Sequence, residues 1–305
     1  MPRSESRFHG IYPMAYAFFD SQGRLDREAM RLQVEACIAA GANGMAALGL
    51  ATEVDKLSLE ERHQVLEWVA ADVAGRVPLA ITVFGNTAAE QVNFVQAAAA
   101  AGADWVILQP PRTSGLSEQD CAAFFGAVME ASPLPVAIQN APEFLGFGLS
   151  ADSIETLRRA HDSFVVLKGE GPVVQIKEVI DRTGGRLAVF NGRNGLELPD
   201  DLRAGCAGII PTPESCQAQA RIYELMQSGS AEDEVAAERL YQEILPALVF
   251  VMQSLESLHC YGKRIHAWSL GLEAVHDRSP CLQPTDFGLA CARRHAAKLG
   301  LSRTQ

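Results

Sequence analysis

The sequence predicts an α/β protein, a (β/α)8 TIM barrel with an appended C-terminal helical region. Short apolar runs alternate with helical patterns eight times along the chain, and the repeat of roughly 25–30 residues is the size of a βα unit. The runs are apolar on both faces, as in buried parallel strands. No Gly-x-Gly-x-x-Gly follows the first run, which disfavours an open dinucleotide-binding sheet.

Each apolar run is short and ends before a turn or a helix start, as strands of a barrel do. The predicted strands cover residues 11–19, 44–48, 78–84, 104–109, 135–139, 163–168, 187–191 and 206–211.

Helix starts follow most of these strands. Asp26 is placed to cap a helix over 27–40, and Gly41 is placed to end it. Ser58-Leu-Glu-Glu61 and Thr87-Ala-Ala-Glu90 are capping boxes that open the next two helices. Further helices are predicted from 117 to about 131, from 150, from after the sixth strand to 180, over about 196–204, and from Pro213 to 228.

The chain divides into a barrel over residues 1–229 and appended helices over 230–305. A barrel of ~250 residues or slightly fewer is usual, and the remainder lacks a strand pattern. No linker or low-complexity segment separates the two parts, so we expect two or three helices packed on the barrel.

The charge balance restricts the partners. The 305 residues carry a formal net charge of −11, which argues against nucleic acid and against anionic membranes. No apolar run is long enough to span a bilayer, and the first ten residues lack a signal peptide pattern. The seven scattered cysteines form no Cys-x-x-Cys pair, so we expect a reducing, cytoplasmic location.

Lys168 is the most informative residue for function. It ends the apolar run 164–168, so its side chain is predicted to enter the barrel mouth, where active sites of this fold lie. Removal from water favours the neutral amine of a lysine, which attacks carbonyl carbons. The alternative is a strand-end lysine that reaches solvent.

Several motifs together resemble the dihydrodipicolinate synthase and N-acetylneuraminate lyase superfamily. They are Gly49-x-x-x-Glu53, Pro110-Pro111, Asn140-x-Pro142, Lys168 as a strand end, and a C-terminal helix with Lys263. The resemblance implies that Lys168 forms an imine with a 2-oxo acid such as pyruvate, with no metal or separate cofactor. It also implies a homotetramer or homodimer.

The loop after the second strand departs from the family pattern. Leu50 and Ala51 stand where family members carry two threonines whose hydroxyls face the substrate, and Thr52 stands where glycine is usual. We expect Ala51 and Thr52 to bind the substrate, with backbone N–H groups of this loop holding its carboxylate and the Thr52 hydroxyl adding a bond. The alternative for Thr52 is a helix cap.

The family's proton-relay tyrosine is also absent. Arg112 stands near its place, either to bind an acid substituent or as a solvated loop charge. Gln139 replaces a second tyrosine, and Phe144 replaces the arginine that holds aspartate semialdehyde in dihydrodipicolinate synthases. These changes argue against that synthase activity.

Gln139-Asn-Ala-Pro142 and Lys168-x-Glu170-x-Pro172 resemble the 2-keto-3-deoxy sugar acid dehydratase branch. In that branch the glutamate two residues past the lysine takes part in proton transfer. Glu170 is therefore the candidate base that removes a C3 proton from the imine. The alternative is a solvated or structural glutamate.

The remaining candidate substrate-binding residues are Gln139, Asn140, Gly192 and Ile210. The resemblance implies close backbone approach at Gly192 and a carbonyl contact at Ile210. Asn140 is expected mainly to fix the turn before Pro142. The 193–194 pair either contacts the distal end of a sugar acid or starts the next helix.

The leading prediction is a Schiff-base lyase acting on a 2-oxo acid, either a 2-keto-3-deoxy sugar acid dehydratase or a pyruvate-dependent aldolase, with dehydration favoured. One alternative is dihydrodipicolinate synthase, that is, 4-hydroxy-tetrahydrodipicolinate synthase. The other is a barrel that only binds a small acid. No His/Asp cluster indicates a metal-dependent aldolase.

Overall fold

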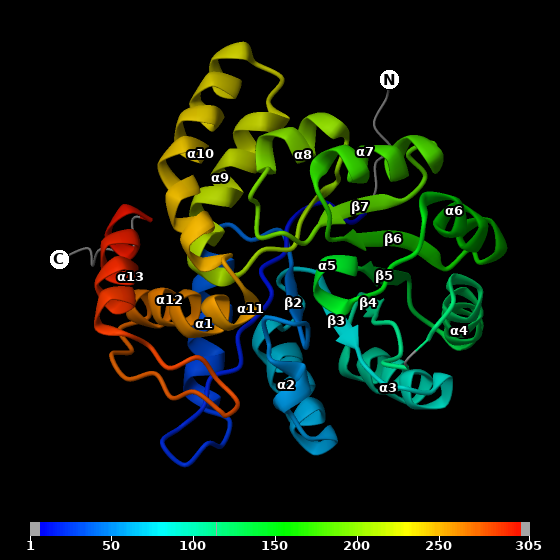
Figure 1. Ribbon diagram of the computed structural model, residues 1–305, viewed down its shortest axis with the longest axis horizontal. Coiled ribbons are helices and arrows are strands. Elements are labelled where there is room, and N and C mark those ends of the chain that lie inside the picture. Colours follow the sequence, from blue (N-terminus) through cyan, green and yellow to red (C-terminus); the bar gives the residue numbers. More distant parts are fainter. Residues whose placement is uncertain (1–6, 114, 300–305) are drawn as a thin grey trace.

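Eight parallel strands form one sheet whose order is β1-β8-β7-β6-β5-β4-β3-β2. The computed structural model describes residues 7–113 and 115–299, so most of the segment assessed for a signal peptide lies outside the described residues. Helices surround the strands (Figure 1), and the arrangement fits a (β/α)8 barrel. The strands are β1 (Gly10–Ile11), β2 (Met45–Ala47), β3 (Leu79–Val83), β4 (Trp105–Leu108), β5 (Val136–Asn140), β6 (Phe164–Gly169), β7 (Ala188–Asn191) and β8 (Gly208–Ile209).

The ring closes through the segment that follows β1. Met14 and Ala46 form a parallel bridge, and the Ala46 amide donates to the Pro13 carbonyl at 2.9 Å. The predicted first strand, 11–19, is therefore too long. Pro13 lacks an N–H and cannot donate to a ladder, so regular pairing stops at Ile11 and only the Met14 bridge continues it.

The helices between the strands begin close to the predicted positions. Both predicted capping boxes are present, at Ser58 with Glu61 and at Thr87 with Glu90. A short helix after β5 and a 3-10 turn after β2 were not predicted. The elements are α1 (Arg27–Ala39), η1 (Val54–Lys56), α2 (Leu59–Val73), α3 (Ala88–Ala101), α4 (Glu118–Ala131), α5 (Pro142–Leu145), α6 (Ala151–Ala160), α7 (Val173–Arg182), α8 (Leu198–Ala204), η2 (Pro213–Ser215) and α9 (Cys216–Gln227).

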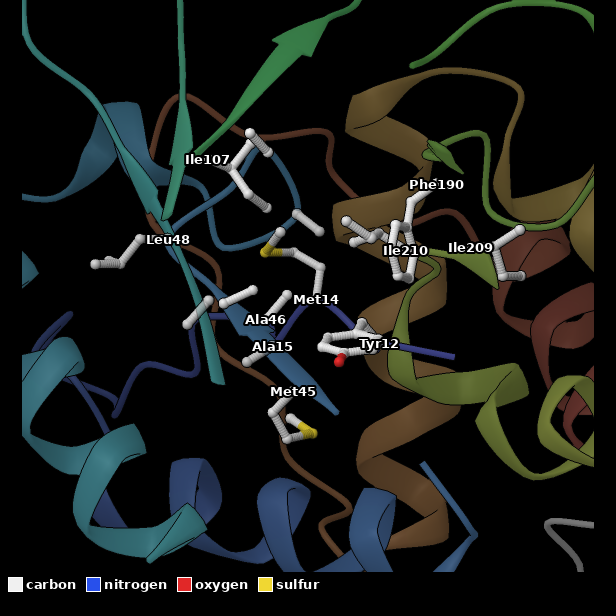
Figure 2. Packing of buried hydrophobic residues seen from close by; sticks show 14 of the residues in the cluster. Tyr12, Met14, Ala15, Met45, Ala46, Leu48, Ile107, Phe190, Ile209 and Ile210 are labelled. Carbon is white, nitrogen blue, oxygen red and sulfur yellow. The ribbon is translucent and has the colours of Figure 1, made fainter. Parts of the chain in front are cut away.

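Large aromatic side chains fill the interior of the ring. The rings of Tyr12, Trp105 and Phe190 meet pairwise, with centroids 5.2 to 5.7 Å apart, and Figure 2 shows Tyr12 beside Phe190. Such contacts add about 0.5–1.5 kcal/mol per pair beyond the burial of their area. These contacts join the segment after β1 to β4 and β7 inside the ring.

Helical segments follow the barrel units, and α10 packs beside α9 (Figure 1). Within the described ranges no single helix is both long and apolar enough to cross a membrane; one bent pair meets those criteria only when its members are combined. The segments are α10 (Ala231–Val251), α11 (Leu255–Ser257), the π-helix η3 (Leu258–Gly262), α12 (Lys263–Ser269) and α13 (Asp286–Lys298).

A buried ion pair ties α12 to the loop after β2. Lys263 is fully buried and its Nζ donates to Glu53 Oε2, while Lys56 Nζ lies 2.5 Å from Glu53 Oε1. Burial alone would raise the pKa of Glu53, but the nearby cations and hydrogen bonds outweigh it and lower the pKa. Glu53 thus binds lysine side chains from two elements, η1 and α12, and joins them.

Replacement of Phe190 by alanine is expected to lower the free energy of unfolding by about 3–5 kcal/mol, because the side chain is fully buried between two rings. Phe287→Ala is the matched control, since Phe287 is 78% exposed. Urea unfolding followed by circular dichroism measures both. Equal midpoints for the two variants would contradict this account of the interior.

Replacement of Lys263 by methionine is expected to destabilise the protein by about 3 kcal/mol, because Glu53 loses a buried cation. Lys177→Met removes a surface pair with Asp181, where both side chains are about half exposed, and is expected to change stability little. Thermal unfolding at neutral pH compares the two. A Lys263 variant as stable as the Lys177 variant would refute the anchoring role.

Candidate functional site

A pocket of about 370 Å³ opens at the carboxyl ends of the strands. Barrel loops supply most of its walls, and the segment after α10 supplies the rest. The lining residues are Met14, Leu50, Ala51, Phe144, Lys168, Glu170, Gly192, Asn194, Ile210, Pro211, Thr212, Met252, Leu255 and Leu258.

The pocket contains one charged pair. Lys168 is the fifth residue of β6, and its Nζ lies 2.7 Å from Oε1 of Glu170. Both side chains are buried. A Cβ on Gly192 would stand 2.5 Å from Cγ of Glu170, so only glycine at that position leaves room for the carboxylate beside the lysine. The arrangement brings an amine and a proton acceptor into direct contact.

A chain of amide side chains holds the carboxylate from behind. Gln139 Nε2 donates to Glu170 Oε1 at 2.5 Å, and Gln109 Nε2 donates to Gln139 Oε1 at 2.8 Å. Gln91 in α3 donates to the backbone carbonyl of Gln109 at 2.8 Å. A carboxylate accepts but does not donate, so the charge on Glu170 fixes the orientation of both amides. Gln139, predicted to bind substrate, has both amide atoms occupied by other side chains.

The loop after β2 lines the pocket with Leu50 and Ala51. The Thr52 hydroxyl donates to the Ala15 carbonyl at 2.6 Å, and its amide donates to the Gly49 carbonyl at 3.1 Å. Thr52 therefore holds the loop against the segment after β1. Within the described part of the chain, the amides of Leu50 and Ala51 have no hydrogen-bond acceptor. Of the two loop residues predicted to bind substrate, Ala51 has a free amide, whereas the amide and hydroxyl of Thr52 both donate within the protein.

Arg112 stands apart from the lining residues. Its guanidinium lies 2.5 Å from Asp55 and 5.0 Å from the centroid of the Phe84 ring. Its side chain is 45% exposed. Of the two roles considered for Arg112, this geometry matches the solvated loop charge.

Asn140 also acts on the backbone. Its amide donates to the Leu149 carbonyl at 3.0 Å, and its Oδ1 accepts from the Leu149 amide at 2.7 Å. These bonds fix the turn that carries α5. Gly192 and Ile210, by contrast, both line the pocket.

A second buried polar cluster adjoins the pocket. Thr212 Oγ1 lies 2.6 Å from Glu214 Oε1 and 2.9 Å from Asn194 Oδ1, and the Tyr16 hydroxyl donates to Glu214 Oε2 at 2.9 Å. Burial raises the pKa of Glu214. The polar atoms of Asn194 and Thr212 are thus occupied by this cluster. Sequence reasoning missed Tyr16, Thr212 and Glu214, and no spacing pattern signals that they meet.

The contribution of the C-terminal segment to the pocket wall was also not predicted from the sequence. Met252, Leu255 and Leu258 reach the pocket from the C-terminal segment. The apolar stretch 244–255 indicates that this segment is buried against something. The spacing of its apolar residues does not show which surface it contacts. Across residues 7–113 and 115–299, no group of three or more His, Cys, Asp or Glu side chains is arranged to hold a metal ion.

Comparison with known proteins gives one consistent family. The dihydrodipicolinate synthetase family model matches residues 7–283. A 4-hydroxy-tetrahydrodipicolinate synthase from Halorhodospira halophila is 25% identical over 283 residues, covering 91% of each chain. The crystal structure of a putative dihydrodipicolinate synthetase from Pseudomonas aeruginosa has a TM-score of 0.88 and 26% identity, covering 96% of this chain and 99% of that one.

A third match shares the fold at lower identity. The protein YagE from E. coli K12, solved in complex with pyruvate, has a TM-score of 0.86 and 23% identity, covering 97% of this chain and 100% of that one. The family match extends over the barrel and the first C-terminal helices, which confirms the resemblance seen in the sequence. The chain belongs to the dihydrodipicolinate synthetase family, a family of lyases.

Proposed function

We propose that this lyase forms a Schiff base between Lys168 and a 2-oxo acid and that it dehydrates a 4-hydroxy-2-oxo acid. The observation that carries the proposal is the buried contact of 2.7 Å between Lys168 Nζ and Glu170 Oε1 on the pocket wall. Family membership supports it, and the pyruvate complex of one structural neighbour supports a 2-oxo acid as ligand. The covalent lysine imine takes the place of a separate cofactor.

Imine formation needs a neutral amine. Glu170 accepts a proton from the Lys168 ammonium, and the freed amine attacks C2 of the 2-oxo acid. The resulting carbinolamine expels its hydroxyl group, which leaves as water with the proton that Glu170 held. The carboxylate is then ionised again beside the new iminium.

Dehydration follows from the iminium. The positive charge at C2 makes the C3 protons acidic, and Glu170 removes one of them. The electron pair forms a C3–C4 double bond as hydroxide leaves C4, and the departing oxygen takes up the proton from Glu170. Hydrolysis of the imine then releases the product. Aldol cleavage begins from the same iminium but breaks the C3–C4 bond.

The substrate carboxylate is assigned to the loop after β2. The free amides of Leu50 and Ala51 are the available donors there, and backbone N–H groups bind carboxylates well in dry sites. Gly192 and Ile210 are assigned to the backbone wall beside the reacting carbons. Gln139 and Asn140 are assigned positioning roles, through Glu170 and Leu149 respectively.

4-Hydroxy-tetrahydrodipicolinate synthase activity is the second candidate. The names of the relatives favour it. Phe144 lines the pocket where the family resemblance places an arginine, and this disfavours it. Conversion of pyruvate with aspartate semialdehyde distinguishes it from dehydration. A barrel that only binds an acid is distinguished from both by the absence of an imine.

The wider organisation is proposed on the same basis. Residues 1–229 are assigned to the catalytic barrel and 230–305 to helices packed on it, in line with α9 ending at Gln227 and α10 beginning at Ala231. A cytoplasmic homotetramer or homodimer is the assembly that the family resemblance implies. Size-exclusion chromatography with light scattering tests the assembly.

Borohydride reduction in the presence of pyruvate is expected to attach pyruvate to Lys168, because the imine forms there. Peptide mass spectrometry locates the adduct. Lys168→Met is expected to abolish it, while Lys177→Met, a surface variant, is expected to retain it. If no 2-oxo acid gives an adduct on Lys168 in the native chain, the Schiff-base mechanism is excluded.

Glu170→Gln is expected to slow exchange of the C3 protons of pyruvate with D₂O by about 10²–10⁴-fold, since the amide cannot accept the proton. The Lys168 adduct is expected to form more slowly, because Glu170 no longer takes the ammonium proton, but to accumulate on long incubation with borohydride, because water can accept that proton instead. Glu143→Gln, at an exposed glutamate of α5, is the control. Exchange is followed by NMR. Unchanged exchange in the Glu170 variant would rule it out as the base.

A further inference from the structure

We infer that the substrate carries an apolar group on C4, so that its class is a 4-hydroxy-2-oxo acid with an aliphatic or aromatic tail. The inference rests on the proposed function and narrows the substrate of the same site. It follows from the composition of the pocket wall beyond the Lys168–Glu170 pair.

Most of the wall is hydrocarbon. Five large apolar side chains from three parts of the chain line the pocket: Leu50, Phe144, Met252, Leu255 and Leu258. Phe144, Met252 and Leu255 are only partly buried. Partly buried apolar side chains that converge on a pocket gain most when an apolar ligand group covers them.

The polar lining side chains offer nothing to a hydroxylated tail. Apart from the reactive pair, only Asn194 and Thr212 among the lining residues have polar side chains. Thr212 Oγ1 is shared between Glu214 Oε1 and Asn194 Oδ1, and Asn194 Nδ2 donates to Glu214 at 3.4 Å. A substrate hydroxyl in this pocket would replace its bonds to water with contacts to carbon.

The cations near the mouth are also occupied. Arg112 pairs with Asp55 at 2.5 Å, and Arg193 pairs with Glu197 at 2.8 Å. Neither arginine is among the lining residues. Among the described lining residues Lys168 is the one cation, so a carboxylate or phosphate at the far end of the substrate would find no further positive side chain on this wall. Of the 193–194 pair, only Asn194 lines the pocket.

Two substrates of equal size test the inference. Racemic 4-hydroxy-2-oxohexanoate and racemic 4,5-dihydroxy-2-oxopentanoate differ only by a methyl group in place of a hydroxyl group. Both can be dehydrated or cleaved, so consumption measured by chromatography covers either reaction. We expect kcat/KM to be roughly tenfold or more higher for the hexanoate, and larger still for a 4-hydroxy-2-oxo acid with a phenyl group on C4.

The chain offers a matched pair of variants. Leu255 and Leu59 each follow a serine N-cap and precede a glutamate, at the first position of a helix. Leu255 lines the pocket, whereas Leu59 is 63% exposed. Leu255→Asn is expected to reduce the preference for the hexanoate at least threefold, and Leu59→Asn is expected to leave it unchanged.

The outcomes separate this inference from the proposed function. A Lys168 adduct with pyruvate, together with equal or faster consumption of the dihydroxy acid, overturns the apolar tail and leaves the Schiff-base lyase standing. The same holds if Leu255→Asn shifts selectivity no more than Leu59→Asn. Absence of any adduct overturns the proposed function itself. A Lys168 adduct, together with the expected preference for the hexanoate and a reduced preference in the Leu255→Asn variant, supports both the proposed function and the apolar tail.

Discussion

The site depends on keeping an ammonium and a carboxylate together out of water. Removing one partner of such a buried pair is costly, so the surroundings must supply every remaining contact. Lys168 gains its partner from the residue two positions later, and Glu170 gains a further donor from Gln139. The missing side chain of Gly192 provides the space. Changes at any of these positions therefore act on the contact between Lys168 and Glu170.

The barrel meets this requirement by distributing the support over neighbouring strands. Gln109 follows β4, Gln139 lies in β5, and Lys168 lies in β6, so the amide chain runs across the sheet instead of along one segment. The rings around Tyr12 join β4, where the amide chain begins, to β7 on the far side of β6. The accuracy of the site is thus a property of the ring, since no single loop contains it.

The features that could be predicted from the sequence are those that a few neighbouring residues determine. The eight apolar runs and the two capping boxes are local, and the lysine at the end of its strand could be found for that reason. The partners of Thr52 and Arg112 could not be predicted, because Ala15 reaches Thr52 only through closure of the barrel and Asp55 reaches Arg112 only through the order of the strands in the sheet. Leu255 is far from Lys168 in the sequence. The spacing of apolar residues in a helical segment does not show which part of the protein they will contact, so its place in the pocket could not be predicted.

The chain positions that line the pocket have an evolutionary consequence. Lys168 lies in β6 and Glu170 directly after it, whereas Met252, Leu255 and Leu258 lie within seven positions, 252–258, after the last barrel unit. Mutation in this short stretch leaves the reactive pair untouched. Substitutions in residues 252–258 can therefore reshape part of the pocket wall while Lys168 and Glu170 are inherited unchanged, and the ion pair of Lys263 with Glu53 anchors the helix that follows this segment.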